Sequence, residues 1–357
     1  MTYNYREIVP YLLDWFDLNA RILAWRENPK PYYVWISEIM LQQTRVEAVK
    51  GYFDRFITVL PDIRSLAEAE EELLLKLWQG LGYYNRVRNL QKAARIVVKR
   101  YGGELPADYD ELIKLPGIGD YTAGAIASIA YQLPVPAVDG NVLRVTKRIA
   151  GSFDDITDTK VKRNQRNDLL EIMPERSGDF NQSLMELGAL ICLPNGKPLC
   201  KQCPVMHICK AFHNNTIAQI PVKPARKERK IEERTILFLD YQGTYAIRKR
   251  APKGLLAGLW EYPGLEGKLS RQELSEILMR DTLLPLEILS MGEAKHVFSH
   301  VEWHMIGYYI KLSTIPAQLN GCVLDCIWAG EDQIKKVYSI PSAFHAFSDK
   351  YMGNKGD

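Results

Sequence analysis

Four of the six cysteines of this 357-residue chain lie within eighteen residues, in the segment CLPNGKPLCKQCPVMHIC. Thiolates this close together can surround one metal centre, which restricts the local fold more than any other feature of the sequence. Zinc sites usually combine two distant C-x2-C pairs, whereas only one pair here has that spacing. A compact all-cysteine set also suits a [4Fe–4S] cluster. The residues of the set are Cys192, Cys200, Cys203 and Cys209.

The rest of the composition is that of a globular protein, 46% apolar and 25% charged, and the formal net charge of +3 indicates no particular partner. The N-terminal stretch MTYNYREIVPYLLDW carries charges where a signal peptide needs an apolar core. The uncharged stretch 121–138 contains prolines and predicts a buried helix and a loop, not a membrane span. We therefore expect a cytoplasmic monomer with reduced cysteines, in which Cys322 and Cys326 are small core residues.

The pattern of apolar residues changes once along the chain. Up to about residue 213 they recur at three- and four-residue spacing, as in EELLLKLWQGL and NLQKAARIVVKRY, which predicts helices. The segment 219–234 is rich in proline and charge and predicts an exposed linker. The fold class is therefore multidomain: an all-α domain over 1–218, followed by a smaller α+β domain over 235–357.

The C-terminal domain combines strands with a helix. RTILFLDY and TYAIRKR predict two strands around a turn at Gln242 and Gly243, and HVFSHVEWHMIGYYIKL predicts a further strand region. SRQELSEILMR predicts a helix with Ser270 as N-cap and Glu273 three residues later.

The segment LPGIGDYTAGAI predicts a glycine turn between two helices, with Asp120 as the N-cap of the second helix. Gly117 and Gly119 leave backbone amides uncovered at the positive end of that helix, where a phosphate can bind. Any two packed helices can be joined by a glycine turn, so this feature alone does not identify a DNA-binding site.

Two carboxylates are candidates for acid–base chemistry. Glu38 lies in the helical segment VWISEIMLQQT, where its helical neighbours are mostly apolar, so desolvation should raise its pKa toward that of a general acid. The alternative is a solvent-facing glutamate, the commonest fate of this residue. Asp139 in PAVDGNVLRV precedes a helix, and from the sequence alone it is better explained as an N-cap.

The segments EIMLQQT, LPGIGDYTAG and VDGNV, followed by the cysteine loop, resemble in sequence and order the MutY-type adenine DNA glycosylases of the endonuclease III, or helix-hairpin-helix, superfamily. The resemblance implies that Glu38 protonates adenine and later activates water. It implies that Asp139 stabilises an oxocarbenium ion or bonds to it transiently. It also implies one [4Fe–4S] cluster and no nucleotide cofactor, although seven residues separate Cys192 and Cys200 where the family has six.

Further residues are assigned by the same resemblance. The related endonuclease III branch has a lysine nucleophile where this chain has Tyr121, and a phenol cannot form an imine, so we expect base removal without strand cleavage. Base flipping requires residues that fill the gap in the duplex. The residues that match the family's wedge are Gln43, Leu81 and Tyr83, and those that match its adenine pocket are Trp25, Arg26 and Leu41. The basic residues Arg86, Arg88, Lys92 and Arg95 could meet phosphates, but such a run usually forms a solvated face.

The C-terminal domain resembles a Nudix fold at GLLAGLWEYPG, but the acidic metal-binding signature of that fold is missing, so we expect a binding module. Phe298, Ser299 and His300 match the family loop that recognises 8-oxoguanine. His296, His300 and His304 recur at four-residue spacing, and on one strand they would lie about 13 Å apart, too far to share a metal ion.

The sequence therefore predicts a monofunctional adenine DNA glycosylase that acts on duplex DNA containing adenine opposite 8-oxoguanine or guanine. Three alternatives stay open. They are a bifunctional glycosylase and lyase that acts on oxidised pyrimidines, a lesion-binding protein without turnover, and a nucleotide pyrophosphatase.

Overall fold

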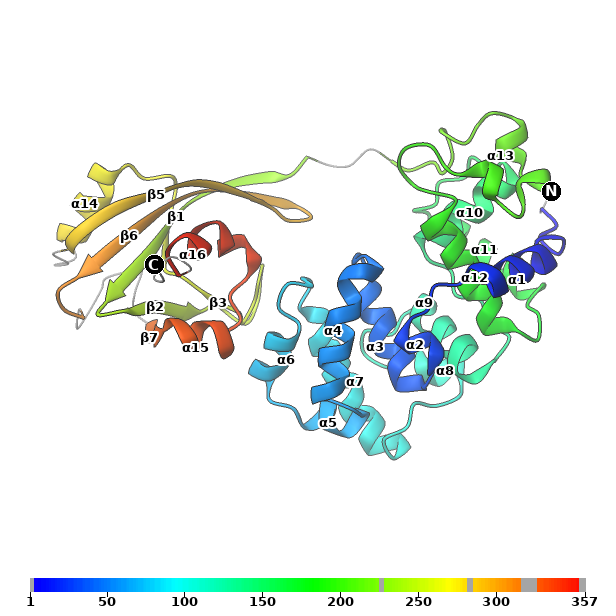
Figure 1. Cartoon of the computed structure of the whole chain (residues 1–357), viewed down its shortest axis with the longest axis horizontal. Coiled ribbons are helices and arrows are strands. Elements are labelled where there is room, and N and C mark those ends of the chain that lie inside the picture. The colour runs from blue at the N-terminus through cyan, green and yellow to red at the C-terminus, as the bar shows by residue number, and fades with distance from the viewer. Residues whose placement is uncertain (1–2, 225–227, 281–284, 316–325, 353–357) are drawn as a thin grey trace. The chain divides into compact units, whose positions relative to one another are not determined.

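The computed structural model describes residues 3–224, 228–280, 285–315 and 326–352, and the chain forms two compact units (Figure 1). The first unit comprises Met1–Ala69 and Asn85–Ala225, and the second comprises Glu70–Tyr84 and Arg226–Asp357. Cys322 lies outside the described residues, whereas Cys326 is half-buried at the edge of an apolar cluster. No helix among the described residues is long and apolar enough to cross a bilayer.

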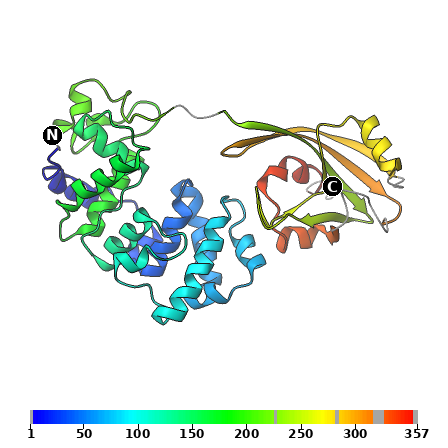
Figure 2. The ribbon, with the colours of Figure 1, turned by 180° about the vertical axis from the view of Figure 1, so that it is seen from behind.

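The described elements of the first unit are all helical (Figures 1 and 2). They are α1 (Ile8–Asn19), α2 (Ala24–Glu27), α3 (Pro31–Leu41), α4 (Val46–Val59), α5 (Ile63–Glu68), α7 (Asn85–Tyr101), α8 (Tyr109–Leu112), α9 (Asp120–Ala125), the π-helical turn η1 (Ile126–Ala130), α10 (Gly140–Ala150), α11 (Thr159–Leu170), α12 (Ser177–Leu190), the 3₁₀ turns η2 (Cys200–Gln202) and η3 (Met206–Ile208), and α13 (Lys210–His213).

One apolar core of this unit joins helices that are far apart in the sequence. Its residues recur at helical spacing along α1, α10 and α12, so each helix turns one stripe inward. The cysteine loop is attached to the same core through Val205, which is fully buried, and through Ile208, Cys192 and Cys203, which are partly buried. The loop therefore lies directly on the packed ends of α10 and α12.

The second unit contains a seven-stranded sheet with the order β3-β2-β1-β6-β5, in which β4 also pairs with β1 and β7 with β2. β1 and β6 are parallel and the other pairs are antiparallel. The elements are α6 (Glu71–Leu77), β1 (Lys230–Tyr241), β2 (Thr244–Lys249), β3 (Trp260–Glu261), β4 (Gly264–Glu266), α14 (Arg271–Arg280), β5 (Pro285–Val297), β6 (Val301–Leu312), β7 (Cys326–Gly330), α15 (Glu331–Lys336), the 3₁₀ turn η4 (Ser342–Phe344) and α16 (His345–Met352).

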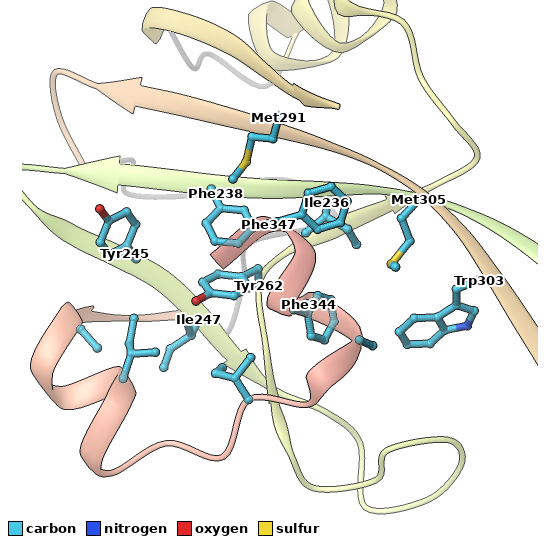
Figure 3. Packing of buried hydrophobic residues seen from close by; sticks show 14 of the residues in the cluster. Ile236, Phe238, Tyr245, Ile247, Tyr262, Met291, Trp303, Met305, Phe344 and Phe347 are labelled. Atoms are coloured by element: carbon cyan, nitrogen blue, oxygen red, sulfur yellow. The ribbon is translucent and has the colours of Figure 1, made fainter. Parts of the chain in front are cut away.

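The alternation of side chains along β1 explains why helices cover both faces of the sheet. Ile236 and Phe238 point to one face, where they meet Phe344 and Phe347 from η4 and α16 (Figure 3). The intervening leucines, at 237 and 239, point to the other face and pack with Leu274 and Leu278 of α14. β1 is thus buried on both faces, and the domain has a helix–sheet–helix arrangement.

Local signals in this unit agree with the predictions. Gln242 and Gly243 both have positive φ, of 51° and 81°, which is the requirement of a tight hairpin turn between β1 and β2. The backbone N–H of Ser270 donates to Glu273, and that of Glu273 donates to the Ser270 hydroxyl, which together form the expected capping box of α14.

The structure corrects two predictions about local structure and refines a third. β1 begins at Lys230, so the linker predicted over 219–234 is shorter. The strand region predicted over 296–312 contains a turn at Phe298–His300, which joins the end of β5 to its antiparallel partner β6. The second helix of the glycine turn begins after Gly119, which is its N-cap, so Asp120 is the first helical residue.

The segment Glu70–Tyr84 groups with the C-terminal residues, which differs from the contiguous helical domain expected over 1–218. The segment is joined to the C-terminal residues by hydrogen bonds and an ion pair from side chains of α6 and the turn that follows it. Lys76 Nζ donates to the carbonyls of Ile334 (3.4 Å) and Tyr338 (3.0 Å), and Gln79 Nε2 donates to Ile340 O at 2.8 Å. Glu72 also forms an ion pair of 2.6 Å with Lys249. These contacts have no signal in the local sequence pattern.

Candidate active site

Glu38 is a buried carboxylic acid of the first unit. It lies in the middle of α3, where Pro31 occupies the first turn, and only 5% of the residue is exposed. Burial raises its pKa to about 7, with Asp139 also raising it and with Tyr121 and Arg26 lowering it. A carboxyl group with a pKa raised this far can hold a proton near neutral pH, as a general acid requires.

Tyr121 lies directly beside this carboxyl group. Its hydroxyl donates to Glu38 Oε2 at 2.5 Å and also reaches the Met185 sulfur at 3.6 Å. Burial and the neighbouring carboxylates raise the pKa of Tyr121 well above its ordinary value, so the phenol stays protonated and remains a donor. Tyr121 is the second residue of α9, so the glycine turn that precedes this helix sets its position.

Asp139 is the N-cap of α10. Its Oδ1 accepts from the backbone N–H groups of Asn141 (2.9 Å) and Val142 (2.7 Å), and its Oδ2 accepts from Asn141 Nδ2 (2.8 Å). Burial raises its pKa, against the lowering effect of these three hydrogen bonds. The cap and the catalytic candidate are therefore one residue, because the same carboxylate that caps α10 also acts electrostatically on Glu38.

Arg144 links Asp139 to the cysteine loop. Its guanidinium donates to Asn141 Oδ1 at 3.0 Å, to Gly188 O at 2.8 Å and to Cys192 O at 2.9 Å. Asn141 in turn holds Asp139. One buried side chain therefore connects the N-terminus of α10 with the first cysteine of the loop.

The sequence analysis missed Glu186, which organises the other side of the site. Its carboxylate is 1% exposed and accepts from Arg21 Nε (2.6 Å) and Nη2 (2.9 Å) and from Arg26 Nη2 (2.8 Å). The two arginines hold its pKa down to about 2 despite burial. Arg26 also donates through Nε to Gln182, so its guanidinium has a fixed place among the groups that act on Glu38. Glutamate within the apolar stretch SLMELGAL was the available signal.

The other two residues expected in the adenine pocket differ in exposure. Trp25 is 5% exposed and packs edge to face against Phe53 at 5.0 Å, so most of its ring belongs to the core. Leu41 is half-buried at the C-terminal end of α3.

The glycine turn combines one strained position with one open position. Gly117 has φ of 79°, and a Cβ there would lie 2.8 Å from Asn89 Cβ, so this position needs glycine. A Cβ at Gly119 would meet nothing within 4 Å, which leaves the N-terminus of α9 open to a ligand. Tyr109 Oη donates to Asp120 at 2.9 Å and holds the entrance of the helix.

The basic residues of α7 serve the fold at two positions. Arg86 Nη1 donates to the carbonyls of Ile39, Met40 and Gln42 and so satisfies the last groups of α3. Arg95 Nε donates to Ala67 O at 3.0 Å. Both guanidinium groups thus donate hydrogen bonds to backbone carbonyls of the protein.

The residues expected to form the wedge differ in exposure. Gln43 is exposed and has φ of 63°, and Tyr83 is 50% exposed with φ of 47°. Both backbones adopt the left-handed region that non-glycine residues seldom use. Leu81, by contrast, is only 7% exposed, so its side chain is not presented to a ligand in this conformation.

The β5–β6 turn brings two groups of predicted residues together within the second unit. The exposed Ser299 hydroxyl lies 2.6 Å from Tyr83 Oη, although the two residues are far apart in the sequence. Phe298 packs edge to face on Trp303 at 4.9 Å, and its N–H donates to Val301 O. His300 is exposed beside them, whereas His296 and His304 lie on the two different strands.

The four cysteines of the loop line one cavity, together with apolar residues of α10 and α12. Arg148 Nη1 lies 3.3 Å from Cys192 Sγ, and burial raises the pKa of Cys203 to about 12. In the described part of the chain, no three or more His, Cys, Asp or Glu side chains are arranged to hold a single metal ion. Residues 194–197, between Cys192 and Cys200, are exposed, and Gly196 has φ of 74°.

Comparisons with known proteins cover both units. Residues 36–169 match the HhH-GPD superfamily of base excision DNA repair proteins, and residues 234–350 match the NUDIX domain family. The mouse (Mus musculus) adenine DNA glycosylase is 35% identical over 86% of this chain and 71% of its own length. That of Schizosaccharomyces pombe is 35% identical over 81% and 78%, and that of Buchnera aphidicola is 34% identical over 85% and 87%.

Solved structures match the helical part of the chain. A thermostable thymine-DNA glycosylase aligns with a TM-score of 0.53 and 27% identity over 58% of this chain and 97% of its own. Endonuclease III in a non-covalent DNA complex aligns with a TM-score of 0.51 and 26% identity over 60% and 99%. The chain belongs to the adenine DNA glycosylase family, within the HhH-GPD superfamily of base excision DNA repair, and is a DNA N-glycosylase.

Proposed function

We propose that this chain removes adenine mispaired with 8-oxoguanine or guanine by hydrolysis alone, with Glu38, Asp139 and Tyr121 as its catalytic residues. The observation that carries the proposal is the buried Glu38–Tyr121 pair, with Asp139 acting electrostatically on the same carboxyl group. Cleavage of an N-glycosidic bond needs a proton for the departing base and a negative charge beside the cationic sugar, and two carboxyl groups in different environments supply both.

Glu38 is the proton donor in this proposal. Its pKa of about 7 keeps a large fraction of it protonated at neutral pH, and the phenol of Tyr121 fixes one of its oxygens. After the base has left, the ionised Glu38 accepts a proton from the attacking water. Burial raises the pKa of Asp139, and three hydrogen bonds oppose this by favouring its ionised form. The ionised carboxylate would offset the positive charge of the oxocarbenium ion.

Tyr121 supports the assignment of hydrolysis without strand cleavage. A lyase step needs an amine that forms an imine with the sugar. By resemblance, Tyr121 stands at the sequence position of the lysine in the related branch, and its hydroxyl is hydrogen-bonded to Glu38. A phenol with a raised pKa is also a poor nucleophile at neutral pH.

We propose that the Phe298–His300 turn reads 8-oxoguanine together with Tyr83. The Ser299 and Tyr83 hydroxyls are hydrogen-bonded, exposed and able to donate or accept, as recognition of an altered base edge requires. Phe298 is held by Trp303 and adds an apolar contact. This assignment makes the second unit a reader of the lesion and not a nucleotide pyrophosphatase.

We propose that Cys192, Cys200, Cys203 and Cys209 hold one [4Fe–4S] cluster. The donor set is entirely thiol, and all four side chains line one cavity. When bound, the cluster would supply four Fe–thiolate bonds that cross-link the two ends of the loop and its middle. The neighbouring Arg148 guanidinium, 3.3 Å from Cys192 Sγ, would offset the negative charge of the thiolates.

A single-turnover assay on duplex DNA with one adenine opposite 8-oxoguanine tests the proposal, with each sample analysed before and after hot alkali. Breaks that appear only after alkali are expected. Equal breakage without alkali would establish a lyase, and no base loss would leave a lesion-binding protein. Glu38→Gln should abolish base release, and an unchanged rate in this variant would refute the catalytic assignment.

The lesion assignment is tested by the ratio of rates on adenine opposite 8-oxoguanine and adenine opposite guanine. Ser299→Ala should lower this ratio, because one hydroxyl of the pair is lost. Ser275→Ala is the matched control, since Ser275 is half-buried on α14 and its hydroxyl bonds to Arg271 O of its own helix. Equal ratios in the two variants would contradict the assignment.

A further inference from the structure

Asp139 ends an irregular segment, 132–139, that links η1 to α10. The amide side chain of Asn181 holds this segment from the side of α12. Its Oδ1 accepts from the backbone N–H of Ala137 at 3.0 Å, and its Nδ2 donates to the carbonyl of Val135 at 2.9 Å. Asn181 is 0% exposed, so no water competes for these bonds.

The same amide reaches the helix that carries Tyr121. Asn181 Nδ2 also donates to Ser128 Oγ at 2.8 Å, and Ser128 Oγ donates to Gly124 O at 2.7 Å. Ser128 lies in η1, a π-helical turn that continues α9. Such turns are rare and often occur at functional sites. Asn181 thus joins the segment before Asp139 to the helix of Tyr121.

The orientation of the Asn181 amide is determined by its partners. Only the oxygen can accept from the Ala137 N–H, and only the nitrogen can donate to the Val135 carbonyl. With both donor hydrogens and the acceptor used, no other side chain has the same hydrogen-bonding pattern except glutamine, which is one methylene too long.

We propose that Asn181 is a positioning residue for base excision: its amide fixes the 135–137 segment against α9 and η1, and so sets the place of the Asp139 carboxylate relative to Glu38 and Tyr121. The inference rests on the proposed function, since it assumes that Asp139 acts on the substrate. The hydrogen bonds of the Asn181 side chain go to Val135, Ala137 and Ser128, so it acts on Asp139 through the backbone and not by direct contact.

A displacement of Asp139 would change the pKa of Glu38, which a loss of stability alone would not do. Three groups act on Glu38, one from each neighbouring element: Tyr121 from α9, Asp139 from the start of α10 and Arg26 from α2. Asp139 is the one that raises the pKa of Glu38. If Asp139 withdraws, this pKa falls, and the alkaline limb of the pH–rate profile moves to lower pH because the general acid loses its proton earlier.

The test compares Asn181→Ala and Ser128→Ala with the control Ser183→Ala. Ser183 is also fully buried on α12, but its hydroxyl donates only to Phe180 O of the same helix. Single-turnover base release is measured across a pH series on a duplex with adenine opposite 8-oxoguanine or guanine. Affinity is measured on the same duplex with 2′-fluoroadenosine, whose fluorine disfavours the oxocarbenium ion and keeps the base attached.

For Asn181→Ala we expect base release to slow by about 10- to 100-fold, as for a misplacement of up to about 1 Å, with the alkaline limb moved to lower pH. Affinity for the fluorinated duplex should stay within about threefold, because the contacts with DNA are intact. Ser128→Ala should give the same pattern with a smaller rate loss. The inference would be overturned if Asn181→Ala had the same rate and the same alkaline limb of the pH–rate profile as the Ser183→Ala control. If Asn181→Ala fails to fold, Ser128→Ala is judged by the same two measurements.

Asp139→Asn separates this inference from the function on which it rests. If Asp139→Asn is slow while the Asn181 and Ser128 variants match the control, Asp139 is catalytic and the positioning role alone is refuted. If Asp139→Asn retains the original rate of base release, adenine removal stands, but the catalytic role proposed for Asp139 is refuted and the positioning role with it.

Discussion

Gly124→Ala is the substitution whose effect on catalysis follows most directly from the coordinates. Gly124 lies in α9, three residues after Tyr121, and a Cβ at this position would be 2.4 Å from the carbonyl oxygen of Pro136 and 3.2 Å from Ala137 Cα. Both neighbours are backbone atoms of the segment that leads to Asp139, so neither can yield by a change of rotamer. Gly124 is therefore required because the backbone of residues 136–137 packs directly against α9 at this position.

The size of the effect follows from the overlap. Ordinary van der Waals contact begins at 3.4 Å, so the segment must retreat from α9 by about 1 Å. A misplacement of this size near reacting groups costs about 100-fold in rate. The added methyl should also cost about 1–3 kcal/mol through overpacking, against a gain of about 1 kcal/mol in helix propensity, which leaves a net loss of about 0–2 kcal/mol.

Single-turnover base release and urea unfolding of the same preparations measure the two effects. Gly51→Ala is the matched control, because Gly51 lies in α4 and a Cβ there would meet only Arg55 Nη1, at 3.5 Å. This control should keep its activity and gain up to about 1 kcal/mol of stability. A Gly124→Ala enzyme that releases adenine within about threefold of the original rate would refute the argument, since it would mean that the segment can move without displacing Asp139.

Three further predictions concern the carboxyl groups and the cysteines. Tyr121→Phe removes a hydrogen bond that lowers the pKa of Glu38, so this pKa should rise and the alkaline limb of the pH–rate profile should move to higher pH. An unchanged limb would contradict the assigned contact. Glu186 has its pKa lowered from 4.5 to about 2, which corresponds to about 3 kcal/mol of stability, fully present above the unfolded pKa and lost as the pH falls through the folded one. Glu186 should therefore contribute about 2 kcal/mol to the drop in unfolding free energy between about pH 5 and pH 3, and this contribution should be missing in Glu186→Gln but present in the exposed control Glu47→Gln. Cys203→Ser should lose the brown colour expected of the purified protein, whereas a colourless original would point to zinc.

Much of the candidate site could be predicted from local sequence because its physical cause is local. The burial of Glu38 follows from the apolar residues three and four positions away on α3, and those neighbours exist wherever the helix forms. The cysteine loop is likewise local, since its four thiols lie within eighteen residues. Tyr121 was assigned by resemblance, and the glycine turn that positions it is a short-range feature.

The partners that determine how these residues work could not be read from the pattern. Glu186 meets Arg26 across 160 positions of sequence, and Asn181 meets Ala137 across 44. Neither contact leaves a periodic signal, because a side chain that is buried by a distant helix has the same local neighbours as one that is exposed. Leu81 shows the same limit from the other side: a leucine between two glycines suggests an exposed loop, but its side chain is buried in this structure, and its role as a wedge stays a prediction.

Sequence alone determined which segments become helices or strands, because spacing of 3.6 or 2 residues fixes which face can be buried. It also determined the chemistry available, by its choice of two carboxyl groups, one phenol and four thiols. Tertiary structure decided the rest. The parallel pairing of β1 with β6, the grouping of α6 with the C-terminal residues and the placement of Asp139 beside Glu38 all depend on contacts between distant segments. Such contacts form only when the whole chain compensates the entropy of closing long loops, so no local pattern contains them.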